Sequence, residues 1–145
     1  MGSGAEIGPA LVDDPRVAGL SFTGSVATGR RLAAACAARG AKFQLEMGGK
    51  NPLIVLADAD LDQAVDCALQ GSYFSTGQRC TASSRLIVEA KVHDAFVARL
   101  RQRLEALKVG HALERGTQMG PVVDASQLDQ NLAYVDIARN EGAEH

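Results

Sequence analysis

The sequence has no long apolar run and no block of like charge. Its apolar stretches are short, as at Leu53 to Ala57, whereas a helix that crosses a bilayer needs roughly 18 to 20 such residues. Lysine and arginine number 15, and aspartate and glutamate 17, so the formal net charge is −2. We therefore expect neither a membrane span nor a nucleic-acid partner.

Cysteine and histidine are also scarce. Cys36, Cys67 and Cys80 are an odd number of cysteines without C-x-x-C spacing, and the three histidines have no metal-ligand spacing around them. Neither a disulfide framework nor a metal site is indicated. Free thiols fit a reducing compartment, so we expect a cytoplasmic protein. The N-terminus also lacks the basic and apolar segments of a secretory signal.

The two ends of the chain lack the features of natural boundaries. It opens on a glycine-rich stretch, Met1-Gly2-Ser3-Gly4, and closes on Gly142-Ala143-Glu144-His145, just after a helical pattern. We therefore expect the chain to be a piece of a longer protein.

Apolar residues recur with two different periods along the chain. Residues 42–47 alternate polar and apolar side chains, which predicts a strand with one buried face. Phe96, Leu100, Leu104 and Leu107 recur at helical spacing. The predicted elements are, in order, one or two helical turns within 3–12, a strand at 17–22, a helix at 26–39, a strand at 42–47, a strand at 51–56, a helix after residue 60, a strand at 85–89, a helix that reaches about residue 108, and a helix near 126–140.

Ser25 is the expected cap of the helix at 26–39, and Gly40 is expected to end it in a left-handed conformation. Asp58 or Asp60 is the expected cap of the next helix.

Strands and helices that alternate through short glycine-containing joints are typical of an α/β protein with a mainly parallel sheet. An apolar fraction of 46% is enough for a hydrophobic core. No shift in composition marks a linker. The one candidate joint between domains is Gly48-Gly49-Lys50.

A first candidate site follows the predicted strand that ends near Phe22. The chain reaches Gly24 and begins a helix at Ser25, so free backbone N–H groups face any ligand above the end of the strand. A phosphate group fits there. The spacing is not the G-x-G-x-x-G of dinucleotide-binding proteins, and a tight strand-to-helix turn without a ligand is the alternative.

Glu46 is a candidate general base. It stands on the polar side of a predicted strand, and one residue separates it from the flexible pair Gly48 and Gly49. A carboxylate at the end of a strand can reach into a cleft and remove a proton from water. The alternative is a strand charge that faces solvent.

Cys80 is a candidate nucleophile. It lies in a polar loop beside Arg79, and a nearby cation can lower the pKa of a thiol. A small buried side chain is the alternative. Cys36 and Cys67 fall within predicted helices and are expected in packing positions. Lys50 and Arg79 are expected to be solvated charges, and a role in positioning substrate or backbone is the alternative.

Three segments of the chain form a series. They are Phe22-Thr23-Gly24-Ser25, Leu45-Glu46-Met47-Gly48-Gly49-Lys50-Asn51-Pro52 and Gly77-Gln78-Arg79-Cys80-Thr81. Together they resemble three consecutive signatures of the NAD(P)-dependent aldehyde dehydrogenase superfamily, and the 34-residue interval from Glu46 to Cys80 fits that family. Met119-Gly120-Pro121-Val122 also resembles a turn of the family's catalytic domain, so the resemblance covers the chain as an internal fragment.

The resemblance implies an aldehyde-dehydrogenase-like three-layer αβα fold. Residues 1–49 would be the C-terminal part of the nucleotide-binding domain, and residues 50–145 the N-terminal part of the catalytic domain. NAD or NADP is the implied cofactor. The residues implied at the cofactor are Gly24, Ser25, Glu46, Met47 and Gly48.

The resemblance also implies a reaction. Cys80 would attack the aldehyde carbonyl, hydride would pass to the nicotinamide, and Glu46 would activate the water that hydrolyses the thioester to a carboxylic acid. The expected partner is a small-molecule aldehyde, and a homo-oligomer is expected. The family's oxyanion-hole asparagine, its ribose-binding groups and its oligomerisation strand are expected outside these 145 residues.

Within the family, the segments around Glu46 and Cys80 are most similar to 2-oxoglutarate semialdehyde dehydrogenases, which implies that substrate. Two alternatives stay open. One is an acylating or reductive relative, which the presence of Glu46 disfavours because such an enzyme has no use for hydrolytic water. The other is a catalytically incomplete fragment that only folds and self-associates.

Overall fold

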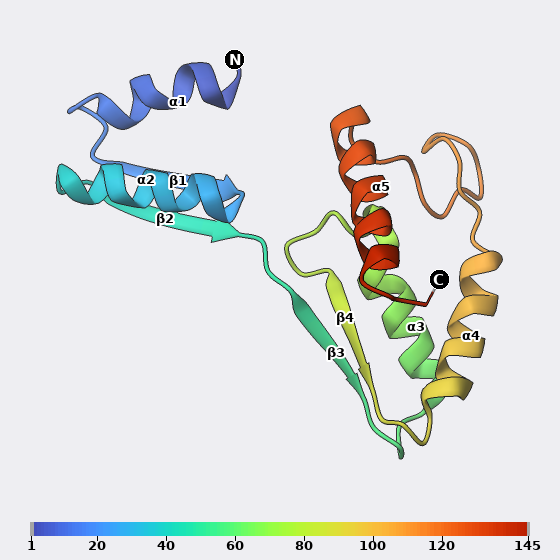
Figure 1. Cartoon of the computed structure of the whole chain (residues 1–145). Helices are drawn as coiled ribbons and strands as arrows, with labels where there is room; N and C mark the ends of the chain where they lie inside the picture. The colour runs from blue at the N-terminus through green and yellow to red at the C-terminus, as the bar shows by residue number, and fades with distance from the viewer. Residues whose placement is uncertain (1, 145) are drawn as a thin grey trace. The chain divides into compact units, whose positions relative to one another are not determined.

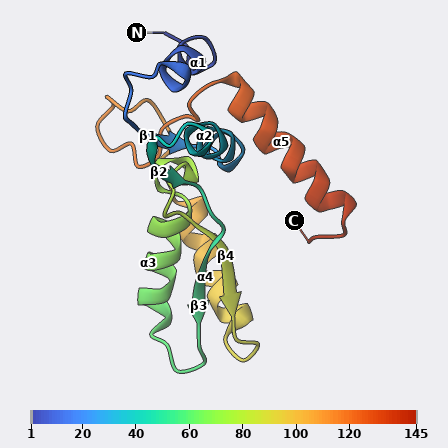
Figure 2. The same ribbon diagram turned by 90° about the vertical axis from the view of Figure 1, so that its left-hand side faces the viewer.

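The fold is known from a computed structural model, which describes residues 2–144 (Figures 1 and 2). The chain divides into two compact units, Met1–Gly49 and Lys50–His145. Each unit has its own parallel strand pair. The assignment of these units to a nucleotide-binding domain and a catalytic domain stays a prediction.

The first unit is a strand–helix–strand motif preceded by one helix. Strands β1 and β2 pair in parallel, and helix α2 connects them and packs against both (Figure 1). A helical crossover is the usual connection between parallel neighbours. The elements are α1 (Gly4–Asp13), β1 (Gly19–Gly24), α2 (Val26–Ala38) and β2 (Lys42–Met47).

Helix α1 is longer than the sequence analysis expected. The hydroxyl of Ser3 accepts a hydrogen bond from the N–H of Ala5, and the helix continues through Pro9 to Asp13. Glycines and a proline lowered the expected helix content of this segment, because each disfavours a helix interior. The N-cap at Ser3 and the tertiary contact with α2 offset that preference.

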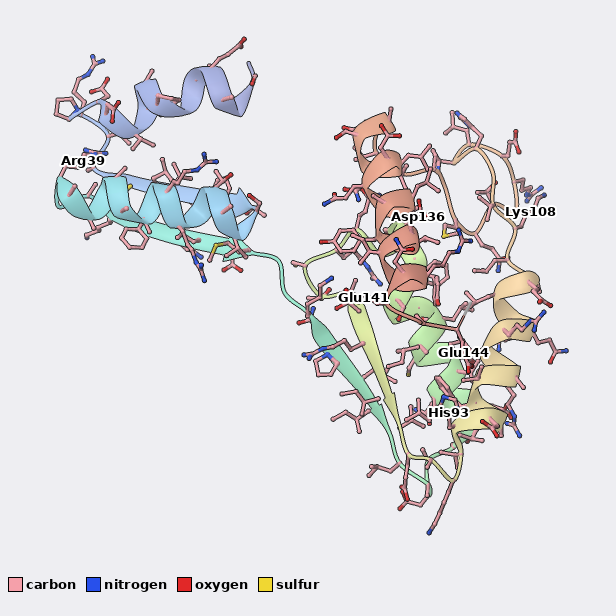
Figure 3. The ribbon with its side chains drawn as sticks, viewed as in Figure 1. Arg39, His93, Lys108, Asp136, Glu141 and Glu144 are labelled. Carbon is pink, nitrogen blue, oxygen red and sulfur yellow. The ribbon has the colours of Figure 1, made fainter. Side chains whose placement is uncertain are left out.

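Helix α2 matches its prediction closely. Ser25 caps it, its side chain accepting from the N–H of Thr28 at 3.2 Å, and Gly40 follows with φ of +71°. Beyond the helix, the guanidinium of Arg39 donates to the carbonyl of Val17 at 2.6 Å and so joins the end of α2 to the segment before β1 (Figure 3). The predicted cap and left-handed end are both confirmed.

The second unit repeats the strand–helix–strand motif and adds further helices. Strands β3 and β4 pair in parallel, and α3 and α4 lie together on one side of the pair (Figures 1 and 2). Asp60 caps α3 by accepting from the N–H groups of Asp62 and Gln63. The elements are β3 (Asn51–Val55), α3 (Leu61–Ser72), the 3-10 turn η1 (Phe74–Gly77), β4 (Ser83–Val88), α4 (His93–Glu105) and α5 (Ala125–Asn140).

The core of the second unit lies between the strand pair and α3 and α4. Its fully buried members are Val55, Val65, Ala68, Leu69, Phe96 and Leu100. The opposite side of the strand pair is exposed to solvent: Ile54 of β3 is 63% exposed and Ile87 of β4 50%, and Leu56, directly after β3, is 57% exposed. Strand side chains alternate between two faces, so one face of this sheet is packed and the other carries exposed apolar side chains.

Two predictions about side-chain burial are wrong. Cys67 was expected in a packing position but is exposed, because α3 buries Val65, Ala68 and Leu69 and a residue two positions from Val65 points to the far side of the helix. In β2 the expected buried face is only half-buried, and Phe43 is 45% exposed. Cys36 is fully buried, as expected.

The segment between α4 and α5 is irregular but closed by backbone hydrogen bonds. The carbonyl of Lys108 accepts from the N–H of Gln118 at 2.8 Å, and the N–H of Lys108 donates to the Gln118 side chain at 3.0 Å. An isolated bridge joins Val109 and Met119. Within residues 2–144, none of the helices combines the length and the apolarity that a membrane crossing needs.

Candidate active site

The predicted cofactor residues meet at one edge of the first strand pair. Gly24 pairs in register with Met47, and Thr23 pairs with Glu46. Ser25 follows β1 and Gly48 follows β2. In α/β proteins the carboxyl ends of parallel strands are where ligands bind, so the sequence-predicted group is gathered at the chemically appropriate edge.

The N-terminus of α2 adds hydrogen-bond donors to this edge. The hydroxyl of Ser25 is engaged in capping: it accepts from the N–H of Thr28 and donates to the Thr28 hydroxyl at 3.0 Å. The first N–H groups of the helix have no partner within the helix, and they carry the positive end of its dipole. The backbone here, more than the Ser25 side chain, offers an anion its contacts.

The side chain of Met47 packs closely against Gly29 of α2. A Cβ atom on Gly29 would lie 2.5 Å from the Met47 sulfur. The side chain of Met47 is therefore turned toward α2 and half-buried, and its backbone alone takes part in the edge. A cofactor role for Met47 would accordingly belong to its main chain.

Glu46 presents a free carboxylate. It is exposed on β2, and across the part of the chain that the structure describes its carboxylate takes part in no ion pair or hydrogen bond. A carboxylate without a competing partner keeps its lone pairs available for a water proton.

Cys80 lies at a corner of a tight turn. The N–H of Ala82 donates to the carbonyl of Arg79 at 3.0 Å, which closes a four-residue turn with Cys80 and Thr81 at its centre. The Cys80 thiol is free and exposed, while Ala82 is buried. The turn is thus anchored by a buried residue at one end and exposes the Cys80 thiol to solvent.

The segment before the turn has an unusual backbone. Ser75 and Thr76 have φ of +55° and +54°, and Gly77 has φ of +71°. Residues other than glycine rarely adopt a positive φ, and those that do cluster at functional sites. At Gly77 a Cβ atom would also lie 2.8 Å from the carbonyl oxygen of Ser72, so only glycine fits there.

Arg79 is exposed, as expected of a solvated charge, and its guanidinium also binds backbone carbonyls, which was the alternative from sequence. Its guanidinium donates to the carbonyls of Gln70 and Gly71, at 2.5 and 3.4 Å. Those carbonyls belong to the last turn of α3, where a cation is favourable because the helix dipole is negative there. Arg79 therefore ties the Cys80 turn to α3.

Asn51 and Arg85 tie the turn to the strands. The side-chain amide of Asn51 donates to the carbonyls of Cys80 and Ala82, at 2.8 and 3.2 Å. Arg85 donates to the carbonyl of Lys50 at 2.7 and 3.1 Å. Sequence reasoning missed both roles, because each joins residues about thirty positions apart and leaves no local pattern.

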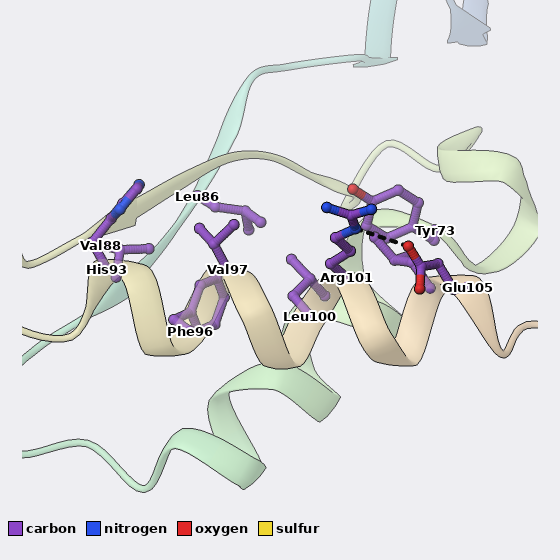
Figure 4. A pocket seen from close by; sticks show the side chains of 10 residues that line it. Tyr73, Leu86, Val88, His93, Phe96, Val97, Leu100, Arg101 and Glu105 are labelled. Carbon is purple, nitrogen blue, oxygen red and sulfur yellow. Dashed lines mark hydrogen bonds and ion pairs between the residues drawn. The ribbon is translucent and has the colours of Figure 1, made fainter. Parts of the chain in front are cut away.

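A separate apolar groove of about 330 Å³ lies between β4 and α4 (Figure 4). The ion pair of Arg101 with Glu105, at 2.8 Å, borders it, and the hydrogen bond and charge of Glu105 raise the pKa of Arg101. None of the sequence-predicted site residues lines this groove. Its lining includes Tyr73, Leu86, Val88, Phe96, Leu100 and Leu104.

The described residues, 2–144, contain no cluster of three or more potential metal ligands. His93 and His111 are both exposed, and His145 lies outside the described residues. The acidic series Asp58, Asp60 and Asp62 includes the α3 cap, as the sequence analysis expected.

Comparison with known proteins decides the family. The model of the "Aldehyde dehydrogenase family" matches residues 1–145. The chain belongs to the aldehyde dehydrogenase family. It is 47% identical over 136 residues to a betaine aldehyde dehydrogenase of Sinorhizobium fredii, covering 94% of this chain and 28% of that protein.

A second relative carries a different substrate in its name. The alpha-ketoglutaric semialdehyde dehydrogenase of Bacillus subtilis is 43% identical over 142 residues, covering 98% of this chain and 29% of that enzyme. The chain therefore spans less than a third of the curated aldehyde dehydrogenases that it matches.

Solved structures show the same fold. A betaine aldehyde dehydrogenase from Staphylococcus aureus, crystallised with NAD+, superposes with a TM-score of 0.94 at 38% identity, covering 98% of this chain and 28% of that one. An aldehyde dehydrogenase from Brucella melitensis gives a TM-score of 0.93 at 39% identity, covering 99% and 30%. The predicted family and its α/β fold are both confirmed.

Proposed function

We propose that the chain contributes the nucleophile and the general base of an enzyme that oxidises an aldehyde to its carboxylic acid. The exposed thiol of Cys80, on a turn tied to α3 and to β3, is the observation that carries this proposal. Membership of the aldehyde dehydrogenase family supports the reaction class. Glu46, with its exposed carboxylate, is the proposed base.

The steps follow from the chemistry of the two side chains. The Cys80 thiolate forms a bond to the carbonyl carbon, and the oxygen of the carbonyl becomes an oxyanion that the N–H of Cys80 can stabilise. Loss of hydride leaves a thioester on Cys80. Glu46 then takes a proton from water, the hydroxide attacks the thioester, and the carbon–sulfur bond breaks to release the acid and the thiolate.

The edge formed by Gly24, Ser25 and Gly48 is the proposed place of the cofactor. NAD or NADP, when bound, supplies the hydride acceptor. Unpartnered N–H groups at the start of α2 fit a phosphate group, and the Staphylococcus aureus relative was crystallised with NAD+. The backbone of Glu46 and Met47 completes this edge.

The substrate proposed from sequence is 2-oxoglutarate semialdehyde, which the Bacillus subtilis relative's name supports. Betaine aldehyde is the competing candidate, because the Sinorhizobium fredii relative has the higher identity. The two differ in charge: 2-oxoglutarate semialdehyde carries one carboxylate, and betaine aldehyde carries a quaternary ammonium. Comparison of kcat/KM for both aldehydes, with the protein at its full natural length, separates them.

Direct trapping tests the proposed nucleophile. In a Glu46→Gln variant of full natural length, mixing with aldehyde and oxidised cofactor followed by acid quenching should leave the acyl group on the Cys80 peptide, detected as a mass increase. Acyl groups found on Cys36 or Cys67, or on no cysteine, would contradict the proposal.

A second candidate applies to the isolated 145-residue polypeptide: it folds and self-associates without turnover. The exposed apolar face of β3 and β4 favours this, with Ile54, Leu56 and Ile87 each at least half exposed. We also propose that the protein forms an oligomer, because this apolar face is exposed, and that it is cytoplasmic, because its thiols are free. An acylating relative remains disfavoured by the free carboxylate of Glu46.

A further inference from the structure

One side chain holds two carbonyls of the turn that carries Cys80. The Nδ2 atom of Asn51 donates to the Cys80 oxygen at 2.8 Å and to the Ala82 oxygen at 3.2 Å. The turn's own hydrogen bond, from the N–H of Ala82 to the carbonyl of Arg79, lies within the same four residues. A primary amide nitrogen has two N–H groups, so it can satisfy both carbonyls at once.

The strand geometry places Asn51 for this contact. Asn51 is the first residue of β3 and pairs with Ser83, but the register shifts before the next pair, Pro52 with Arg85. Such an irregularity re-aims a side chain relative to a regular ladder. Arg85 also binds the carbonyl of Lys50, the residue before Asn51, through two nitrogens. Arg85 thus fixes the backbone next to Asn51, and the Asn51 side chain extends from that fixed point to the turn.

The contact is chemically selective. Alanine at this position would remove both donors. Aspartate would keep the shape but set a carboxylate oxygen against two carbonyl oxygens. Meanwhile Arg79 holds the other end of the turn on α3. The turn is therefore fixed from two elements, and Asn51 is the part of this arrangement that touches the Cys80 residue itself.

We propose that Asn51 is a positioning residue for Cys80: by fixing the Cys80 carbonyl, it fixes the direction of the Cα–Cβ bond and hence the approach of the thiol to the substrate. This rests on the proposed function, in which Cys80 is the nucleophile. Because a misplacement of about 1 Å can cost about 100-fold in rate, loss of the contact affects the chemical step.

The first test is kinetic and uses the protein at its full natural length. Asn51→Ala should lower the rate constant of the first burst of reduced cofactor by about 10- to 100-fold and leave its amplitude and the cofactor affinity unchanged. Asn131→Ala is the matched control: it removes an asparagine that accepts one side-chain bond, from Gln127 at 2.8 Å in α5. The control should retain the wild-type burst rate.

Amide hydrogen exchange in the 145-residue chain gives a second readout. In Asn51→Ala the N–H of Ala82 should exchange about 10-fold faster, while the N–H of Phe96, bonded to Val92 in the core, stays unchanged. Asn51→Asp adds a pH profile: its burst rate relative to wild type should rise as pH falls, since a protonated carboxyl can again donate one hydrogen bond.

Three results would overturn the assignment. They are a burst rate for Asn51→Ala within about twofold of wild type, unchanged exchange at Ala82, and faster exchange at Phe96 as well, which would make Asn51 a general stabiliser of the second unit. Failure of the proposed function looks different: Cys80→Ala would retain turnover, and the exchange results would stand.

Discussion

Each of the three cysteines lies in a different environment, which makes them internal probes of the site. Cys36 is fully buried in α2, Cys67 is exposed on α3, and Cys80 is exposed on its tethered turn. We expect brief iodoacetamide treatment to label Cys80 first, Cys67 next and Cys36 last, because thiol reactivity follows access and local environment. Peptide mass mapping gives the order.

A control in urea checks that this order depends on the fold. Once the chain is unfolded, the three thiols should react at similar rates. Labelling of Cys67 ahead of Cys80 in the native chain would mean that the turn does not present a reactive thiol.

At the scale of single residues, sequence reasoning succeeded where the cause is local. The caps at Ser25 and Asp60 and the left-handed Gly40 each depend on neighbours a few positions away. It failed for Cys67, because helix membership alone does not say which face is buried. It also missed Asn51, whose partners lie 29 and 31 positions along the chain.

Two helical glycines allow a matched test at the scale of elements. Gly29 in α2 is buried against Met47, whereas at Gly8 in α1 nothing would meet an added Cβ atom. Gly29→Ala should destabilise the first unit by about 1 to 3 kcal/mol through overpacking. Gly8→Ala should stabilise it by up to about 1 kcal/mol, since alanine is the better helix former.

Urea unfolding followed by circular dichroism measures both changes. The two substitutions should change the free energy of unfolding in opposite directions. Equal changes in stability for Gly29→Ala and Gly8→Ala would contradict the close packing of α2 against Met47. Met47 lies at the edge where the other candidate cofactor residues lie.

Elements with a strong period were predicted well and those with mixed signals were not. Helix α2, strand β2 and helix α5 fall within one residue of their predicted bounds. Helix α1 was underestimated because Pro9 and its glycines oppose a helix locally while contacts with α2 favour it. Strand β4 begins at Ser83, inside the predicted loop, because pairing with β3 extends it.

At the scale of the whole molecule, the bare face of β3 and β4 predicts self-association. Light scattering on the 145-residue chain should show oligomers that increase with concentration, because exposed apolar faces and strand edges associate. The double substitution Ile54→Lys and Ile87→Lys should shift the chain toward the monomer. Leu113→Lys, at a position 90% exposed in the irregular segment, is the control and should have little effect.

A compact monomer over a wide concentration range would contradict this prediction. So would an equal shift toward the monomer in the Leu113→Lys control, because the association would then depend on net charge rather than on the sheet face.

The class of the fold was predictable because each strand–helix–strand motif is encoded by a run of consecutive residues. Both strand pairs are parallel, as the alternation of elements implied. The register that sets Gly24 beside Met47 was not predictable, since it depends on how α2 packs against the two strands. The same holds for the hydrogen bonds that tie the Cys80 turn to α3 and β3.

The central claim is that Cys80 and Glu46 act in succession on one acyl group, and pre-steady-state kinetics at full natural length test it most directly. Glu46→Gln should give a burst of about one reduced cofactor per active site followed by very slow turnover, because attack and hydride transfer precede the hydrolysis that Glu46 assists. Cys80→Ala should give no burst. An unchanged steady-state rate for Glu46→Gln across neutral pH would contradict the account and leave Glu46 as an exposed strand charge.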